Sequence, residues 1–243
     1  MEKTTTKKFY VYSHSSVPWQ QKIIKDFLKM TLIKKGCRCL DAGCGIGNNL
    51  PTLLKFSKNI FACDIYDNAI SYSKEKHKNA FISFIKADIN QIPFPINYFD
   101  IIICTEVIEH IDNPTQTIKE LFRVLKNNSG YLIISSPNYF NLAGIVKFFA
   151  DKISGKKTWN VWGTNPCGTE YFMTWRKLKK LLSAEKFKII DERGGDFLNS
   201  WLLFLPFVFR NFKYTDKLPF LWLGKIPFLK ILGMNYFILA KTN

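Results

Sequence analysis

The stretch Cys37–Asn49, CRCLDAGCGIGNN, decides the fold because it joins a short apolar run to three closely spaced glycines. Gly43, Gly45 and Gly47 stand at alternate positions, and Asp41 precedes the first of them by two residues. Glycine adopts backbone conformations that other residues avoid, and it has no side chain to keep a ligand away. The pattern predicts a strand that turns sharply into a helix, with a ligand lying against backbone N–H groups at the turn.

The glycine spacing separates this turn from two common phosphate-binding loops. The dinucleotide fingerprint is G-x-G-x-x-G, and a P-loop continues into Gly-Lys-Ser/Thr, whereas this chain has G-x-G-x-G with neither continuation. The Asp41 carboxylate would repel a pyrophosphate, but it suits a cationic group such as an amine or a sulfonium. The sequence therefore favours a positively charged nucleoside ligand and disfavours an NAD(P)-dependent oxidoreductase.

Apolar runs and amphipathic segments alternate along most of the chain, which predicts a mostly parallel sheet with helices on both faces. The expected strands are 37–43, 59–65, 81–89, 99–107, 130–137, 187–194 and 235–242, and the expected helices are 18–35, 48–56, 68–76, 114–125 and 174–185.

The domain organisation follows from where this alternation stops. We expect a single domain over residues 1–243, with a cofactor-binding half at 18–137 and the remaining sheet and helix at 171–195 and 233–243. Segments 138–170 and 196–232 interrupt the pattern with dense aromatic residues, so we interpret them as insertions over one end of the sheet.

Composition limits the class of protein and its surroundings. The 243 residues carry a net charge of +16, which would attract nucleic acid, an anionic membrane or a phosphorylated substrate, although an AT-rich genome also produces such a lysine content. The six cysteines form no CxxC pair, which argues against a zinc site or a thioredoxin-like motif. The N-terminus has no apolar signal segment, and the apolar run 201–209 is too short to span a bilayer. We expect a cytoplasmic protein.

Five segments, taken in order, resemble the motifs of class I S-adenosylmethionine-dependent methyltransferases, and most closely the subgroup of the ubiquinone-biosynthesis O-methyltransferases. They are DAGCGIG at 41–47, Asp64, Asp88-Ile89, FDIIICTEVIEHI at 99–111 and LFRVLKNNSGYLIISSPN at 121–138. The resemblance covers roughly residues 36–138 and is weaker over 170–194 and 235–242. It implies a Rossmann-like α/β fold: a doubly wound, seven-stranded sheet, mostly parallel, with an antiparallel last strand and a helical, aromatic lid.

The resemblance also implies S-adenosylmethionine as cofactor and a role for each matching residue. Asp41 and the three glycines would hold the methionine end, and Asp64 would hold both ribose hydroxyls. Asp88 and Ile89 would contact the adenine. The full expected cofactor-binding set is Asp41, Gly43, Gly45, Gly47, Asp64, Ile65, Asp88, Ile89 and Glu106.

Three interpretations of the segment TEVIEH (105–110) stay open. If it continues as a helix, Glu106, Glu109 and His110 share one face. His110 could then act as a general base oriented by Glu109, and these would be the catalytic residues. The three side chains could instead bind a divalent metal, or Glu109 and His110 could brace loops by hydrogen bonds.

The acceptor is expected to be a hydroxyl or carboxyl oxygen. Enzymes that methylate exocyclic amines of bases usually carry an Asn/Asp-Pro-Pro-aromatic turn where this chain has 105–108, so a nucleic acid partner is disfavoured. A small-molecule, lipid-linked or glycan-linked acceptor fits the resemblance better. The candidate lining of the acceptor pocket is Trp159, Trp162, Tyr171, Phe172 and Trp175.

The aromatic and basic segment 196–232 has two interpretations. It can pack on the sheet with a basic rim, or it can make peripheral contact with the inner surface of a membrane. The competing function is a methyltransferase-fold protein without turnover that binds RNA or an anionic membrane surface.

Overall fold

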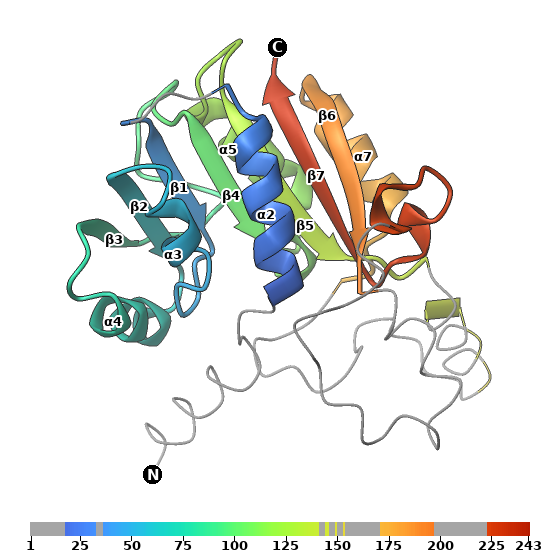
Figure 1. The fold of residues 1–243 in the computed structure, drawn as a ribbon, viewed down its shortest axis with the longest axis horizontal. Helices are drawn as coiled ribbons and strands as arrows, with labels where there is room; N and C mark the ends of the chain where they lie inside the picture. Colours follow the sequence, from blue (N-terminus) through green and yellow to red (C-terminus); the bar gives the residue numbers. More distant parts are fainter. Residues whose placement is uncertain are drawn as a thin grey trace.

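Seven strands form one sheet in the order β3-β2-β1-β4-β5-β7-β6 within the part of the chain that the structure describes (Figure 1). This computed structural model describes residues 18–32, 36–140, 171–196 and 223–243, together with positions 144, 145, 149 and 153. The strands are β1 (Arg38–Ala42), β2 (Asn59–Asp64), β3 (Ile82–Lys86), β4 (Ile101–Thr105), β5 (Tyr131–Pro137), β6 (Phe187–Gly195) and β7 (Asn235–Thr242). The α-helices are α2 (Pro18–Met30), α3 (Leu50–Leu53), α4 (Asp67–Lys76), α5 (Pro114–Val124) and α7 (Trp175–Ala184), and the 3₁₀ helices are η1 (Ile108–His110), η2 (Leu223–Lys225) and η3 (Lys230–Leu232).

The direction of the strands confirms the predicted doubly wound sheet. Strands β1 to β5 pair in parallel, and β7 is inserted antiparallel between β5 and β6. Order reverses between β1 and β4, because β2 and β3 lie on one side of β1 while the later strands lie on the other. Open α/β sheets bind ligands at the carboxyl ends of the strands beside such a reversal, so the tips of β1, β2 and β4 are where a site is expected.

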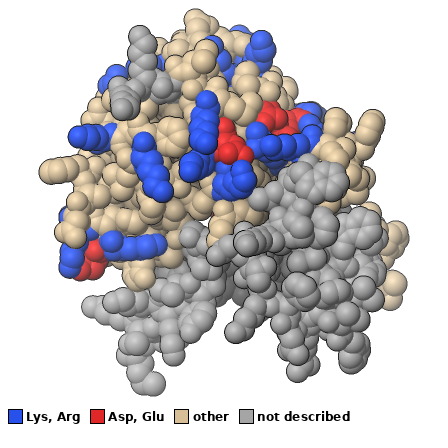
Figure 2. All heavy atoms as spheres, viewed as in Figure 1, with Lys and Arg blue, Asp and Glu red and all other residues tan. Residues whose placement is uncertain are grey.

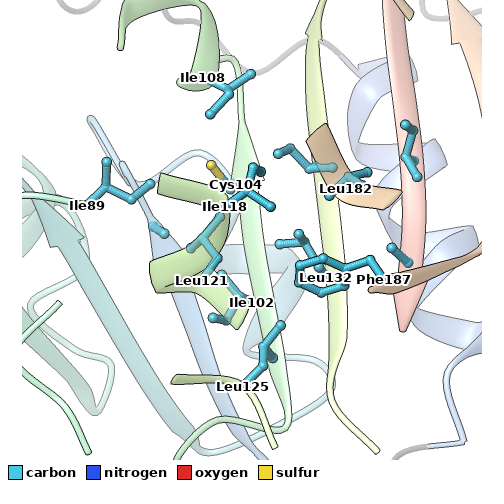
Figure 3. Packing of buried hydrophobic residues seen from close by; sticks show 14 of the residues in the cluster. Ile89, Ile102, Cys104, Ile108, Ile118, Leu121, Leu125, Leu132, Leu182 and Phe187 are labelled. Carbon is cyan, nitrogen blue, oxygen red and sulfur yellow. The ribbon is translucent and has the colours of Figure 1, made fainter. Parts of the chain in front are cut away.

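Alternate residues of the central strands bury their side chains on opposite faces of the sheet. On one face, Leu40 and Ile102 pack beneath α5 and α7, where Figure 3 shows Ile118 and Leu121 of α5 beside Leu182 of α7. On the other face, Cys39 and its neighbours pack beneath α2 and α3. Both faces of β1, β4 and β5 are therefore covered, which is why these strands are continuous apolar runs in the sequence.

Helix α2 covers the front of the sheet in Figure 1 and turns its apolar side inward. Its outward side carries the exposed Lys22, Lys25 and Lys29, and Figure 2 shows Lys and Arg side chains gathered over this face. In the described ranges no helix combines the length and the apolar character needed to cross a membrane.

Three expectations about helices differ in the structure. The helix expected over 18–35 ends at Met30. The segment 48–56 contains only the short α3, and Asn49, which precedes it, makes no side-chain hydrogen bond to the helix start. The segment after β4 is not an α-helix from Glu106, because that residue has a positive φ of 55° and only the 3₁₀ turn η1 follows. Most of the two expected insertions, 138–170 and 196–232, lies outside the described residues.

Candidate functional site

The glycine turn after β1 uses each of its glycines for a different purpose. Gly43, Gly45 and Gly47 have φ values of 72°, 50° and 76°, the left-handed region that glycine tolerates best. A Cβ atom on Gly43 would lie 2.4 Å from Val107 Cγ2, and one on Gly47 would lie 2.4 Å from Ser73 Oγ. A Cβ on Gly45 would meet nothing within 4 Å. Gly43 and Gly47 therefore permit close packing, whereas Gly45 presents open backbone that a ligand can approach.

Backbone N–H groups of the turn bind the tip of β2. The N–H groups of Gly43 and Cys44 both donate to the Cys63 carbonyl oxygen at 2.9 Å, and the Gly45 N–H donates to Asp64 Oδ2 at 2.8 Å. We expected such groups to face a ligand, but these three have protein acceptors. Their role is to fix the turn against β2, so that β1 and β2 end in one rigid surface.

Asp41 is the most unusual group of the site, because it is a carboxylate with no exposed surface. Its Oδ1 accepts a hydrogen bond from Asn49 Nδ2 at 3.1 Å, and its Oδ2 is buried without a hydrogen-bond partner among the described residues. Burial raises the pKa of Asp41 to about 7; the Asn49 hydrogen bond opposes this rise, and the nearby Asp64 charge adds to it. A buried acceptor without a donor is costly, so this oxygen is suited to a cationic donor supplied by a ligand.

Asn49 links Asp41 to three other elements, a role that the sequence reasoning missed. Besides Asp41, its Nδ2 donates to Thr105 Oγ1 at 3.0 Å, at the end of β4. Its Oδ1 accepts from Gln21 Nε2 of α2 at 3.1 Å, and Thr52 Oγ1 donates to Gln21 Oε1 at 2.7 Å. The sequence did contain one sign of this role, which is an amide side chain directly after the glycine run. A polar side chain buried there would need hydrogen-bond partners.

Asp64 lies at the carboxyl end of β2, where it was predicted, and its side chain is partly exposed. Its Oδ1 accepts from the Tyr66 N–H at 3.0 Å, while Oδ2 accepts from Gly45 as described. A carboxylate has about four acceptor positions on its two oxygens, a geometry that suits a pair of ligand hydroxyls. Ile65 and Tyr66 follow with 53% and 48% of their surfaces exposed, which provides apolar surface beside the carboxylate.

The predicted adenine contacts, Asp88 and Ile89, are placed differently from each other. Strand β3 ends at Lys86, so both lie in the following loop, where Asp88 is exposed and its Oδ1 accepts from the Asn90 N–H at 2.8 Å. The Ile89 side chain is 6% exposed and packs into the core (Figure 3). Ile89 therefore supports the loop from inside, whereas Asp88 remains available to a ligand.

Asp88 also lines a cavity of about 770 Å³ between this loop and α5. The remaining lining residues are Asn90, Gln91, Ile92, Pro93, Phe94, Gln116, Glu120 and Arg123. Neither Asp41 nor Asp64 belongs to the lining, so this cavity is distinct from the surface formed by the tips of β1 and β2.

The structure does not bring Glu106, Glu109 and His110 into one donor set. Glu106 Oε1 accepts from Ser135 Oγ at 2.6 Å, and Oε2 accepts from Asn235 Nδ2 at 2.7 Å, so its carboxylate joins β4 to β5 and β7. Across the described ranges, no three His, Cys, Asp or Glu side chains are grouped as metal ligands. The condition for a shared helical face is not met, because Glu106 is left-handed and only a 3₁₀ turn follows it.

Glu109 and His110 remain neighbours. Glu109 is 2% exposed, and its Oε1 lies 3.9 Å from His110 Nε2, too far for a hydrogen bond but close enough to stabilise an imidazolium. The His110 side chain is 18% exposed, so it can be reached from solvent, whereas Glu109 cannot. Of the two predicted catalytic residues, His110 is the more open to an acceptor.

The described aromatic candidates for an acceptor pocket pack against neighbouring rings. Phe172 stacks on Tyr139 with ring centroids 5.7 Å apart, and the Trp175 ring lies 6.3 Å from that of Tyr236. Tyr171 is partly exposed, and its N–H donates to the Glu109 carbonyl oxygen at 2.6 Å. Trp159 and Trp162 lie outside the described residues.

The sheet order and this pair of strand tips define the class of protein. Residues 40–134 match the family described as a methyltransferase domain. Over this part of the chain the match supports the class I S-adenosylmethionine-dependent methyltransferase domain that the motifs predicted, and S-adenosylmethionine is the cofactor of that class. The buried Asp41 oxygen and the open backbone at Gly45 fit such a cofactor, which carries an amino group and a sulfonium.

Individual relatives are similar over part of the chain. Cycloartenol-C-24-methyltransferase 1 of Oryza sativa is 37% identical over 106 residues, which are 41% of this chain and 31% of that enzyme. The mitochondrial ubiquinone biosynthesis O-methyltransferase of Saccharomyces cerevisiae is 27% identical over 169 residues, which are 65% of this chain and 52% of the yeast protein. The chain thus spans about a third to a half of the length of these two relatives.

Similarity of fold extends further than similarity of sequence. A solved structure from Thermotoga maritima, described as an S-adenosylmethionine-dependent methyltransferase and possible histamine N-methyltransferase, matches with a TM-score of 0.59 at 15% identity. The match covers 99% of this chain and 96% of the other. At this identity it supports the fold and not the acceptor.

Proposed function

We propose that this protein transfers the methyl group of S-adenosylmethionine to the oxygen of a small-molecule, lipid-linked or glycan-linked acceptor. The observation that carries the proposal is the buried Asp41 Oδ2, which has no donor among the described residues and belongs to the strand that leads into the open backbone at Gly45. In this proposal Asp41 binds the amino group of the methionine moiety. Asp64 accepts hydrogen bonds from the ribose hydroxyls, and Ile65 and Asp88 border the adenine.

Positioning supplies most of the catalysis in this proposal. The cofactor, when bound, would supply a methyl group on a sulfonium; an acceptor oxygen would bond to that methyl carbon in line as its bond to sulfur breaks, which leaves S-adenosylhomocysteine. Holding two reactants in the reactive orientation removes much of the barrier without acid or base chemistry. The protein's contribution is the rigid surface formed when Gly43, Cys44 and Gly45 bind the tip of β2.

We further propose His110 as the group that removes the proton from an acceptor hydroxyl. Its side chain is reachable from solvent, and the buried Glu109 carboxylate at 3.9 Å would stabilise the imidazolium that forms. The hydrogen-bonded Glu106 then has a separate task, which is to hold the ends of β4, β5 and β7 together.

The relatives support a small acceptor but differ in the atom methylated. The name of the rice relative specifies a carbon of cycloartenol, and that of the yeast relative specifies an oxygen in ubiquinone biosynthesis. We propose an oxygen because the longer of the two alignments is with the O-methyltransferase. We also propose that the enzyme is cytoplasmic and meets lipid-linked acceptors peripherally at the inner membrane surface, to which the exposed lysines of α2 are complementary in charge.

Calorimetric titration with S-adenosylhomocysteine tests the first step. We expect micromolar binding by the wild type, loss of binding in Asp64→Asn, and unchanged binding in the control Asp67→Asn. Asp67 is a suitable control because it lies three positions after Asp64 in the sequence and its exposed carboxylate forms an ion pair with Lys86.

Acceptor screening follows with methyl-labelled S-adenosylmethionine and hydroxylated or carboxylated lipids, and NMR of the product distinguishes an O-methyl from a C-methyl group. A C-methyl product would refute the oxygen acceptor. No binding of S-adenosylhomocysteine by folded wild-type protein would refute methyl transfer, and salt-sensitive retention on RNA or anionic vesicles would then support the competing function.

A further inference from the structure

The last residue of α4 and the residue after it form hydrogen bonds with the glycine turn. Lys76 Nζ donates to the Ile46 carbonyl oxygen at 3.3 Å and to Asn48 Oδ1 at 3.2 Å. His77 Nε2 lies 3.1 Å from the Gly47 carbonyl oxygen. A carbonyl oxygen can only accept, so His77 carries its proton on Nε2 in this contact. Three consecutive residues of the turn are thus held by two consecutive residues at the end of one helix.

The packing at this contact leaves no gap between helix and turn. A Cβ on Gly47 would lie 2.4 Å from Ser73 Oγ and 2.9 Å from His77 Cδ2. Ser73 has no exposed surface, so α4 presses directly on the turn. Figure 1 shows α4 beside the ends of β1 and β2, in agreement with these contacts.

At neutral pH, the charge states of Lys76 and His77 allow both side chains to donate hydrogen bonds to the turn. Partial burial lowers the pKa of His77, and the neighbouring Lys76 charge lowers it further, so the ring is a neutral donor at pH 7. Within the described ranges, the partners of the Lys76 ammonium are two neutral oxygens. Because its acceptors are neutral, the Lys76 ammonium forms no ion pair here, and its hydrogen bonds serve to fix the positions of the two acceptors.

One segment therefore holds the turn at two places. Asp64, at the end of β2, accepts from the Gly45 N–H, and α4 begins three residues later at Asp67 and returns to the turn at Lys76 and His77. The carbonyl oxygens of Ile46 and Gly47 are drawn toward α4, which fixes the orientation of the peptide groups that follow the open backbone of Gly45.

We infer that Lys76 and His77 are positioning residues for the cofactor, acting through the backbone of residues 46–48. The inference rests on the proposed function for the identity of the ligand. Neither residue needs to touch the cofactor. Their hydrogen bonds keep the turn in the conformation that binds the methionine end, so the free protein does not have to order the turn when the ligand arrives.

The test uses variants that separate the hydrogen bond from the bulk of the ring. The amide nitrogen of Gln can occupy the place of His Nε2, whereas Asn is too short and Ala has no donor. By titration with S-adenosylhomocysteine, we expect His77→Ala and His77→Asn to raise Kd about fivefold, the loss expected for one hydrogen bond, and His77→Gln to stay within about twofold. Lys76→Met should weaken binding by a similar factor, Lys76→Arg should not, and the control Lys74→Met, exposed on the same helix, should bind as the wild type does.

A second measurement works without ligand. Hydrogen exchange at the amides of residues 46–48 should accelerate in His77→Ala and return to the wild-type rate in His77→Gln. Equal Kd and exchange rates in His77→Ala and wild type would overturn the inference, as would a Gln variant as impaired as the Ala variant. If the wild type fails to bind S-adenosylhomocysteine, the proposed function fails, and the exchange rates still decide whether these residues hold the turn.

Discussion

Replacing Asp41 by Asn should stabilise the free protein and weaken its binding of the cofactor. The side chain has no exposed surface, and burial raises its pKa from 3.8 to about 7. At about 1.36 kcal/mol for each pH unit, this rise means that ionised Asp41 costs the fold roughly 4 kcal/mol, as an upper estimate, at pH values above 7. Asn has nearly the same shape, carries no charge, and can still accept from Asn49.

The sign of the effect on stability depends on pH. Because the folded pKa lies above the unfolded value, the folded state binds more protons between about pH 4 and pH 7, and the free energy of unfolding of the wild type falls as pH rises through this window. The Asp41→Asn variant lacks this fall. We expect its free energy of unfolding to exceed that of the wild type by about 2–4 kcal/mol at pH 8, and the difference to shrink toward zero near pH 4.

Urea unfolding at pH 4.5 and pH 8, with S-adenosylhomocysteine titration at pH 6 and pH 8, measures both consequences. The ionised carboxylate binds the ligand amino group, so wild-type affinity should be about tenfold lower at pH 6 than at pH 8, in proportion to the ionised fraction. The variant should bind weakly at both values. A variant that is less stable than the wild type at pH 8, or that binds as tightly, would refute our account of this buried carboxylate.

Four other substitutions test separate parts of the site. Gly43→Ala should lose about 2–5 kcal/mol of stability, because its Cβ would overlap Val107 in addition to the left-handed strain. Gly45→Ala should lose only about 1–2 kcal/mol of stability, yet it should bind S-adenosylhomocysteine roughly tenfold more weakly. Thermal unfolding measures the stabilities and calorimetry the affinities, and equal stability losses would contradict the different roles given to the two glycines. His110→Ala should lower kcat about 10²-fold or more with unchanged cofactor affinity, and unchanged turnover would remove the proposed base. Glu106→Gln should cost about 1–3 kcal/mol in urea unfolding, since a Gln amide would direct N–H toward one of the two donors that Glu106 now accepts from, and a neutral result would show that these hydrogen bonds hold little.

Much of the fold could be predicted because the central strands have both faces buried. A strand such as Ile101–Thr105 then appears as an uninterrupted apolar run, although the predicted limits, 99–107, were two residues too wide at each end. The glycine turn was equally predictable, since alternate glycines directly after a strand permit a sharp turn with left-handed residues, which other residues disfavour. The position of Asp64 followed from the same regularity, because it closes the next apolar run.

The remaining features depend on contacts between residues far apart in the sequence. Glu106 adopts a left-handed conformation in which it binds Asn235, which is 129 positions away, and no local pattern in TEVIEH predicts this. The Asn49 side chain donates a hydrogen bond to the buried Asp41 and does not cap the start of α3, which the local sequence does not reveal. Ile89 was expected at the adenine but packs inward, because alternation along the chain does not tell which face a loop residue takes.

The insertion of β7 between β5 and β6 has a consequence for the order in which the sheet can form during synthesis. Strand β6 leaves the ribosome before β7, yet β7 is the neighbour to which it pairs in the sheet. Until residues 235–242 emerge, β5 is an exposed edge and β6 cannot join the sheet beside it. Unpaired edges invite pairing with other chains, and the asparagine that binds Glu106 also arrives with β7. The nascent chain can therefore complete the tips of β1 and β2 early, whereas the tip of β4 waits for one of the last strands to be made.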